Sequence, residues 1–168
     1  GQTTEAIRHY TTALRRAPDN GYAAYNLGQA FYNVSNDTEA QKYFLLALEL
    51  MPDDALTLFG LGQTYSRLGN REKAITCFSK GVALLPDDPD GYELLASELA
   101  KAGRTEDAER QYRKGLSIAP QSATLRFNLA NLVRKKNDTA MARMLYREAV
   151  QLQPDFTAAR DSLASLSR

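Results

Sequence analysis

Cysteine and histidine are almost missing from the chain, which has one of each, Cys77 and His9. A single cysteine excludes an intramolecular disulfide and any metal site made of cysteine alone. The two residues occupy the same place in a repeated unit, two units apart, so several helix spacings of roughly 8–10 Å are expected between them. They cannot share a metal ion or a proton. The sequence therefore predicts no catalytic residues, no metal site and no cofactor, and we expect no enzyme activity.

An excess of charge of either sign is also absent, since 21 Lys and Arg balance 20 Asp and Glu and leave a formal net charge of +1. Such a chain has no global field that attracts nucleic acid or an anionic membrane. The longest apolar run, residues 43–52, is interrupted by Glu49 and is far shorter than the roughly 20 residues of a membrane-spanning helix. We therefore expect neither a nucleic-acid partner nor insertion into a membrane.

One acidic segment, residues 86–97, approaches the pattern of a calcium-binding loop. Asp88 and Asp90 stand in its third and fifth places, but the first place is Pro86 and the twelfth is Ser97. The bidentate glutamate that such a loop needs is therefore absent. Acidic residues at the start of a helix also favour the helix dipole, and we interpret the segment as a helix N-terminus.

Proline recurs at a fixed interval, and this is the clearest pattern in the chain. Five of the six prolines are spaced 34 residues apart, at Pro18, Pro52, Pro86, Pro120 and Pro154. Alignment on this interval brings other residues into columns. One column is Ala6, Ala40, Ala74, Ala108 and Ala142, another is Tyr10, Phe44, Phe78, Tyr112 and Tyr146, and a third is Leu27, Leu61, Leu95 and Leu129. Such self-similarity indicates a repeat architecture.

Each unit has the pattern of two helices joined by a tight turn. A short polar residue that can accept from free N–H groups precedes the first helix, at Asn20, Asp54, Asp88 and Ser122. The turn holds a residue suited to the left-handed conformation, at Ser35, Gly69, Gly103 and Asn137. The second helix ends before the proline, which cannot continue it. Gly81 and Gly115 stand in second helices where other units have alanine, at an expected cost of about 1 kcal/mol each.

A 34-residue helix-turn-helix with L-G-x-x-Y at 61–65, A-x-x-x-F at 74–78 and a closing proline resembles the tetratricopeptide repeat (TPR) family. The resemblance covers the whole chain and implies an all-α, right-handed superhelical solenoid of antiparallel helix pairs. It predicts a single TPR array over residues 1–168, with full repeats at 21–54, 55–88, 89–122 and 123–156, the second helix of a partial repeat at 1–20 and a solvating helix at 157–168.

The two ends of the expected array differ. Leu163 and Leu166 are expected to cover the last repeat, while the charged residues of the same segment, Arg160, Asp161 and Arg168, face water. At the other end, Ile7, Tyr10 and Leu14 lack a first helix of their own. Because a repeat cannot bury its apolar face alone, we expect that the protein continues upstream or that this uncapped N-terminal helix self-associates with another chain.

The resemblance also implies a concave groove lined by the first helices, with ligand-facing side chains at fixed places in each repeat. The candidate peptide-groove residues are Tyr25, Phe59 and Phe127 at the fifth place, Asn26 and Asn128 at the sixth, Gln29, Gln63, Ser97 and Asn131 at the ninth, and Asn33, Arg67, Lys101 and Lys135 at the thirteenth. Aromatic faces can pack apolar side chains, amides can pair with the backbone of an extended peptide, and cations can meet carboxylates. The expected partner is a protein or peptide bound non-covalently.

The sequence is also compatible with other functions. The groove pattern is close to what any repeat of this family carries, so the chain could be a structural or oligomerising spacer that uses its end faces. It could also be the substrate-recruiting segment of a larger enzyme, such as a glycosyltransferase. A clamp for chaperone C-termini is not expected. Of the lysine, arginine and asparagine residues that form such a clamp in proteins resembling this family, only the asparagine at Asn26 is found here.

Overall fold

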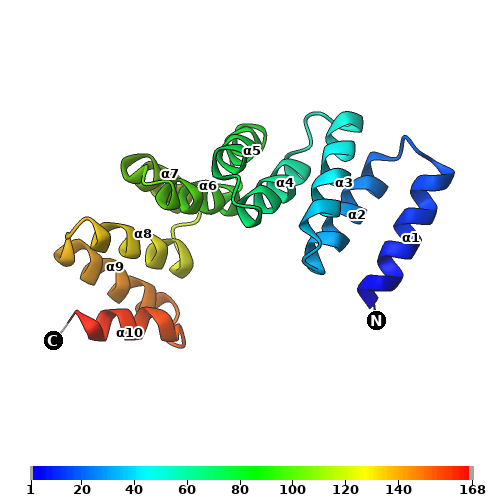
Figure 1. Cartoon of the computed structure of the whole chain (residues 1–168). Helices are drawn as coiled ribbons and strands as arrows, with labels where there is room; N and C mark the ends of the chain where they lie inside the picture. The colour runs from blue at the N-terminus through cyan, green and yellow to red at the C-terminus, as the bar shows by residue number, and fades with distance from the viewer. Residues whose placement is uncertain (1, 167–168) are drawn as a thin grey trace. The chain divides into compact units, whose positions relative to one another are not determined.

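The computed structural model describes residues 2–166, and within them the chain forms ten α-helices and no strand (Figure 1). The helices are α1 (Gln2–Arg16), α2 (Gly21–Asn33), α3 (Asp37–Leu50), α4 (Ala55–Arg67), α5 (Arg71–Leu84), α6 (Pro89–Lys101), α7 (Thr105–Ile118), α8 (Ala123–Lys135), α9 (Thr139–Leu152) and α10 (Thr157–Ser165). Helices joined by the short turns pack in pairs, α2 with α3, α4 with α5, α6 with α7 and α8 with α9. The all-α array of helix pairs is therefore confirmed. We propose the repeat boundaries given above, since one pair lies in each.

The chain divides into two compact units, which we call the first unit (Gly1–Pro86) and the second unit (Asp87–Arg168). The first unit holds α1 to α5, where α1 packs against α2 and α3 packs against α4. In the second unit α7 packs against α8 and α10 packs against α9. Each repeat thus contacts its neighbour within a unit, as expected of a solenoid.

The helix ends follow the sequence signals closely. The four expected N-caps, Asn20, Asp54, Asp88 and Ser122, each accept a hydrogen bond from a first-turn backbone N–H at 2.7–3.2 Å. The four turn residues all have positive φ, 77° at Gly69, 78° at Gly103, 59° at Ser35 and 63° at Asn137. Both predictions are confirmed, because a side-chain cap and a left-handed turn are decided by neighbours close in sequence.

Aromatic side chains of the second helices fill the space between first helices. Phe44 on α3 is fully buried, and it lies against two glycines from different repeats. A Cβ at Gly28 on α2 would stand 2.8 Å from Phe44 Cδ1, and one at Gly60 on α4 would stand 2.7 Å from Phe44 Cζ. Absence of both Cβ atoms therefore lets one ring bridge adjacent repeats, so close packing rather than backbone freedom requires these glycines.

Gly81 gives a different result from the one expected. A Cβ at this position on α5 would stand 2.4 Å from Cε1 of Phe59, whose ring is 7% exposed. The expectation that alanine is the better residue is wrong here, because the ring of Phe59 occupies the place of the methyl group. Gly115, at the equivalent place in α7, is less constrained, since its Cβ would meet the end of the Leu125 side chain at 3.1 Å.

The last helix closes the core of the second unit. Ala159 on α10 is fully buried in a cluster with Ala123 and Ala149. Leu163 and Leu166 are half-buried, and the charged pair Arg160 and Asp161 is exposed, while Arg168 lies outside the described residues. On α1 the three apolar residues Ile7, Tyr10 and Leu14 are half-buried. Within residues 2–166 no helix is long and apolar enough to cross a bilayer.

Candidate peptide-binding surface

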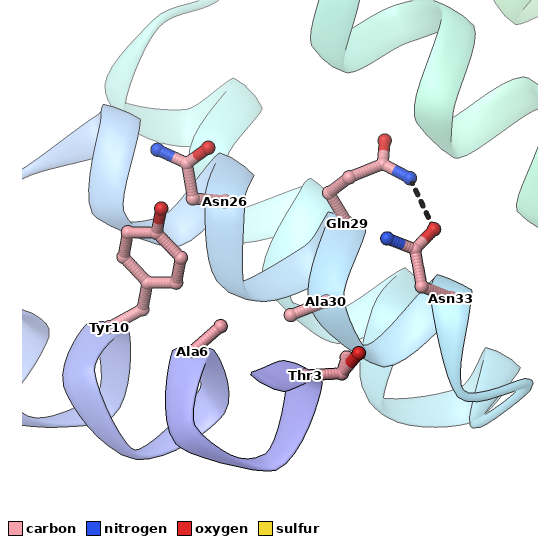
Figure 2. Close-up of a pocket in the computed structure, with 7 residues that line it drawn as sticks. All are labelled: Thr3, Ala6, Tyr10, Asn26, Gln29, Ala30 and Asn33. Carbon is pink, nitrogen blue, oxygen red and sulfur yellow. Dashed lines mark hydrogen bonds between the residues drawn. The ribbon is translucent and has the colours of Figure 1, made fainter. Parts of the chain in front are cut away.

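Three of the predicted groove residues meet in an open pocket between α1 and α2, which we call the first-unit pocket. Asn26, Gln29 and Asn33 line it from α2, together with Thr3, Ala6 and Tyr10 from α1 and Ala30 (Figure 2). Its volume is about 270 Å³. Figure 2 shows Tyr10 reaching from α1 toward the side of Asn26, while Gln29 Nε2 donates to Asn33 Oδ1 at 3.0 Å. The lining mixes polar and apolar side chains and includes no charged residue.

Two of the aromatic candidates, Tyr25 and Phe127, are partly used for packing. Tyr25 is half-buried and lies tilted against Phe44 with ring centroids 6.0 Å apart. Burial, and then the charge of Asp54, raise the pKa of its hydroxyl. Phe127 is half-buried in the second unit and packs against Tyr146 and Phe156, with ring centroids 5.8 Å and 4.9 Å away. Each ring keeps part of its surface open to solvent.

Phe59 does not line a surface at all. Its 7% exposure and its position against Gly81 place the ring in the core of the first unit, which corrects the expectation that it offers a face to a ligand. The physical reason is that Gly81 has no methyl group, which leaves room for the ring. In the repeats of Tyr25 and Phe127 the place of Gly81 is taken by alanines, Ala47 and Ala149. Gln63 on α4 is half-buried and has no hydrogen bond with the described residues.

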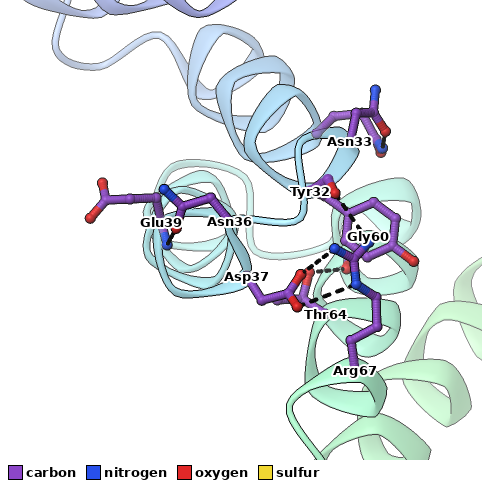
Figure 3. Close-up of polar contacts among 9 residues, drawn as sticks. Tyr32, Asn33, Asn36, Asp37, Glu39, Gly60, Thr64 and Arg67 are labelled. Atoms are coloured by element: carbon purple, nitrogen blue, oxygen red, sulfur yellow. Dashed lines mark hydrogen bonds and ion pairs between the residues drawn. The ribbon is translucent and has the colours of Figure 1, made fainter.

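The guanidinium of Arg67 is already held by other residues of the first unit (Figure 3). Its Nη2 stands 2.7 Å from Asp37 Oδ1, and Nε donates to Asp37 Oδ2 at 3.3 Å. Nη1 donates to the backbone carbonyl of Tyr32 at 3.1 Å, and the guanidinium carbon lies 3.9 Å from the centre of the Tyr32 ring. The arginine thus joins α4 to the end of α2 and the start of α3, and Asp37 already compensates its charge.

Five other predicted residues come together between α6 and α8 in a pocket of about 210 Å³, which we call the second-unit pocket. They are Ser97, Lys101, Asn128, Asn131 and Lys135. Tyr112 on α7 and the apolar residues Ala100 and Leu132 complete the lining. In contrast with the first-unit pocket, this one carries two cations.

The amides of the second-unit pocket are oriented by hydrogen bonds. Asn128 Nδ2 donates to Glu93 Oε1 at 3.0 Å, and Asn131 Oδ1 accepts from the hydroxyl of Tyr146 at 2.6 Å. The carbonyl of Asn128 and the N–H groups of Asn131 have no further partner among the described residues. One acceptor and one pair of donors therefore remain for a ligand. Burial raises the pKa of the Tyr112 hydroxyl to about 12, so this hydroxyl stays protonated.

The two lysines of this pocket differ in their surroundings. Lys101 Nζ lies 3.1 Å from Oε2 of Glu98, a residue of the same helix whose side chain is 3% exposed. Lys135 is exposed and makes neither an ion pair nor a hydrogen bond with the described residues. The charge of Lys101 is thus already compensated in part, and that of Lys135 is not.

Sequence reasoning missed several residues that line these pockets. Tyr10 and Tyr112 belong to the aromatic column of the second helices, which the repeat pattern assigns to packing. Ala100 was missed because an alanine has no chemistry of its own. Comparison of the repeats could have found it, since Tyr32 stands at the same place two repeats earlier.

The two rare side chains lie on different helices of the first unit. His9 is exposed on α1 and stands 3.8 Å from Glu5. Cys77 is buried on α5, where burial raises the pKa of its thiol. Among residues 2–166 no three His, Cys, Asp or Glu side chains converge on one point.

Comparison with known proteins places the chain among helical repeats. The family model described as cilia and flagella-associated protein 70 C-terminal domain matches residues 1–167. No curated protein matches the chain in sequence. MamA 41-end from Desulfovibrio magneticus RS-1 is 20% identical, with a TM-score of 0.87 over 93% of this chain and 88% of that one.

Two further solved structures have the same fold. YrrB, described as a TPR protein with an unusual peptide-binding site, is 21% identical, with a TM-score of 0.83 over 96% of this chain and 83% of that one. TTC0263, a thermophilic TPR protein in Thermus thermophilus, is 18% identical, with a TM-score of 0.78 over 99% of this chain and 91% of that one. At these identities the likeness shows the fold.

Proposed function

Because the chain belongs to the family of the cilia and flagella-associated protein 70 C-terminal domain and is built of tetratricopeptide repeats, we propose that it is a protein-interaction scaffold that binds an extended segment of a partner protein. Each unit contributes a binding surface of its own, the first-unit pocket and the second-unit pocket. The observation that carries the proposal is that eight of the thirteen predicted groove residues line these two pockets.

The chemistry of both pockets suits a peptide backbone. An extended segment presents one N–H and one C=O per residue, and these groups need partners when water is displaced. Asn26 and Gln29 in the first unit, and the oriented amides of Asn128 and Asn131 in the second, supply both donors and acceptors. The half-exposed ring of Tyr25 adds an apolar face. YrrB, which shares the fold, is described as having an unusual peptide-binding site.

Binding by this mechanism is non-covalent and needs no cofactor. The amides are fixed before the partner arrives, because helices hold their backbones and hydrogen bonds hold Asn128 and Asn131. Pre-organisation of this kind reduces the entropy lost on binding. Each amide contact with the partner backbone contributes about 0.5–1.5 kcal/mol.

Selection from a library of random peptides displayed on phage tests the proposal. Peptides are selected on the wild-type chain, and their affinities are then measured for three variants. The first removes two amides, Asn26→Ala with Gln29→Ala, and the second fills the second-unit pocket, Ala100→Tyr. The third is a control on the exposed faces of α5 and α9, Ser79→Ala with Gln151→Ala.

At least one pocket variant should lower the affinity about tenfold, which corresponds to about 1.4 kcal/mol, or the loss of one to two amide contacts. The control should bind as the wild type does, and circular dichroism should show that all three variants stay helical. Failure to select any peptide, or equal binding by every variant, would contradict the proposal and would favour a spacer that uses other faces.

A further inference from the structure

The thirteenth place of the repeat holds a cation in both units, but its surroundings differ between them. Arg67 in the first unit is held by Asp37 and by the backbone carbonyl and ring of Tyr32. A shift of two repeats, 68 residues, takes Arg67 to Lys135. The same shift takes Asp37 to Thr105 and Tyr32 to Ala100, as the printed sequence shows. The second unit therefore keeps the cation and loses both of the side chains that hold it in the first.

This exchange also opens the second-unit pocket. In the first unit the ring of Tyr32 lies 3.9 Å from the guanidinium carbon of Arg67 and fills the space beside it (Figure 3). In the second unit Ala100 lines the pocket instead, and Lys135 lines the same pocket from α8. A small residue and an uncompensated cation thus occur together, in a space of about 210 Å³.

Donors that suit an oxygen anion surround this space. The side-chain carbonyl of Asn131 accepts a hydrogen bond from Tyr146. Its N–H groups have no partner among residues 2–166. Lys101 adds a second ammonium group, although Glu98 on its own helix takes part of its charge. Glu93 accepts a hydrogen bond from Asn128 and is not among the lining residues.

We propose that the second-unit pocket binds a side-chain carboxylate, Asp or Glu, of an extended partner segment, with Lys135 as its main cation and Asn131 as a hydrogen-bond donor. The inference rests on the proposed function and adds the chemistry of the residue that is recognised. The first-unit pocket has no charged residue in its lining and is expected to show no such preference.

A side-chain carboxylate within an extended segment fits the spacing of these helices. Neighbouring packed helices stand roughly 8–10 Å apart, and an extended chain advances roughly 3.3 Å per residue. A segment that crosses from α6 to α8 therefore has about three residues over this pocket, and side chains of alternate residues point to the same face. An acidic side chain in such a segment reaches Lys135 while the backbone remains beside the amides.

The test uses the same phage-displayed random library, in which the displayed peptides have no free C-terminus. Acidic enrichment in the selected pool then reports side-chain carboxylates alone. Selections are run on the wild type, on Lys135→Gln and on Thr105→Asp, which supplies the carboxylate that Asp37 gives to Arg67. Asp at the start of a helix is favourable, so this variant should remain folded. Arg147→Gln, on the exposed face of α9, is the charge-matched control.

The wild-type and Arg147→Gln pools should contain Asp and Glu at about two to three times their library frequency. Lys135→Gln and Thr105→Asp should each abolish this enrichment without preventing selection. For the best acidic peptide, Glu→Gln in the peptide or Lys135→Gln in the protein should weaken binding about five- to tenfold, and the two changes together should weaken it little more.

Two results would overturn the inference. One is a wild-type pool that binds but shows no acidic enrichment, which would leave the proposed function in place and remove only the carboxylate site. The other is equal enrichment on Lys135→Gln and on the wild type, which would assign the carboxylate to another cation. If no peptide is selected on any protein, the proposed function fails together with this inference.

Discussion

The substitution Gly81→Ala tests whether close packing or helix propensity has the larger effect on stability at this position. A new Cβ would stand 2.4 Å from Cε1 of Phe59, where ordinary contacts begin at 3.4 Å, so ring or helix must move by about 1 Å. Overpacking of this kind costs about 1–3 kcal/mol, and alanine returns about 1 kcal/mol of helix propensity. We expect the free energy of unfolding to fall, by up to about 2 kcal/mol. Guanidinium unfolding, followed by circular dichroism, measures it.

Gly115→Ala is the matched control in the second unit. Its Cβ would meet Leu125 Cδ1 at 3.1 Å, so this neighbour must give by only a few tenths of an ångström. Helix propensity should therefore dominate, and the variant should be more stable than the wild type by about 0.5–1 kcal/mol. Equal stabilisation by both alanines would refute the argument that Phe59 requires a glycine.

A second substitution identifies the ring as the cause. Phe59→Leu removes Cε1, the atom that the new methyl group approaches. In this background Gly81→Ala should stabilise the protein rather than destabilise it, so that the two changes are coupled by at least about 1 kcal/mol. Additive effects would show that the cost at Gly81 arises somewhere other than the Phe59 ring.

The remaining predictions concern polar contacts. Arg67→Met should lower the free energy of unfolding by about 1 kcal/mol through loss of its ion pair and ring contact, whereas Lys80→Met, on an exposed face of the same unit, should have almost no effect in the same denaturation assay. Asp54→Ala should cost about 1–2 kcal/mol, because Asp54 accepts from two groups of the first turn, while Asn70→Ala should be nearly neutral, since no cap bond forms there; the difference in unfolding midpoint checks this. The hydrogen bond from Lys136 lowers the pKa of Glu109 below its ordinary value of 4.5. The contribution of Glu109 to stability is therefore fully present above pH 4.5 and is lost as the pH falls through the lowered pKa. Glu109→Gln should remove this pH-dependent part of the free energy of unfolding, a few tenths of a kcal/mol to about 1 kcal/mol. If the variant and the wild type lose the same free energy of unfolding between neutral pH and about pH 3, the prediction is wrong.

Most of the fold could be predicted because its signals are local. The 34-residue spacing of the prolines, the caps such as Asp54 and the turn residues such as Gly69 and Asn137 act on neighbours a few positions away. The candidate surface was predicted less well. Asn26, Asn131 and Lys135 line pockets, but Phe59 lies in the core and Arg67 is held by its own chain.

The sequence by itself determined the helices, their ends and their pairing, since capping, turn conformation and helical periodicity depend on residues within one 34-residue unit. Only the tertiary structure decided which side chains are free to bind. Phe59 is buried because Gly81, on the paired helix, leaves room for its ring, and Arg67 is occupied because Asp37 and Tyr32 belong to the preceding repeat. Lys135 is free because Thr105 and Ala100 stand in their places. Contacts between helices and between neighbouring repeats thus decide which side chains are available to a ligand. The sequence of one repeat alone does not contain this information.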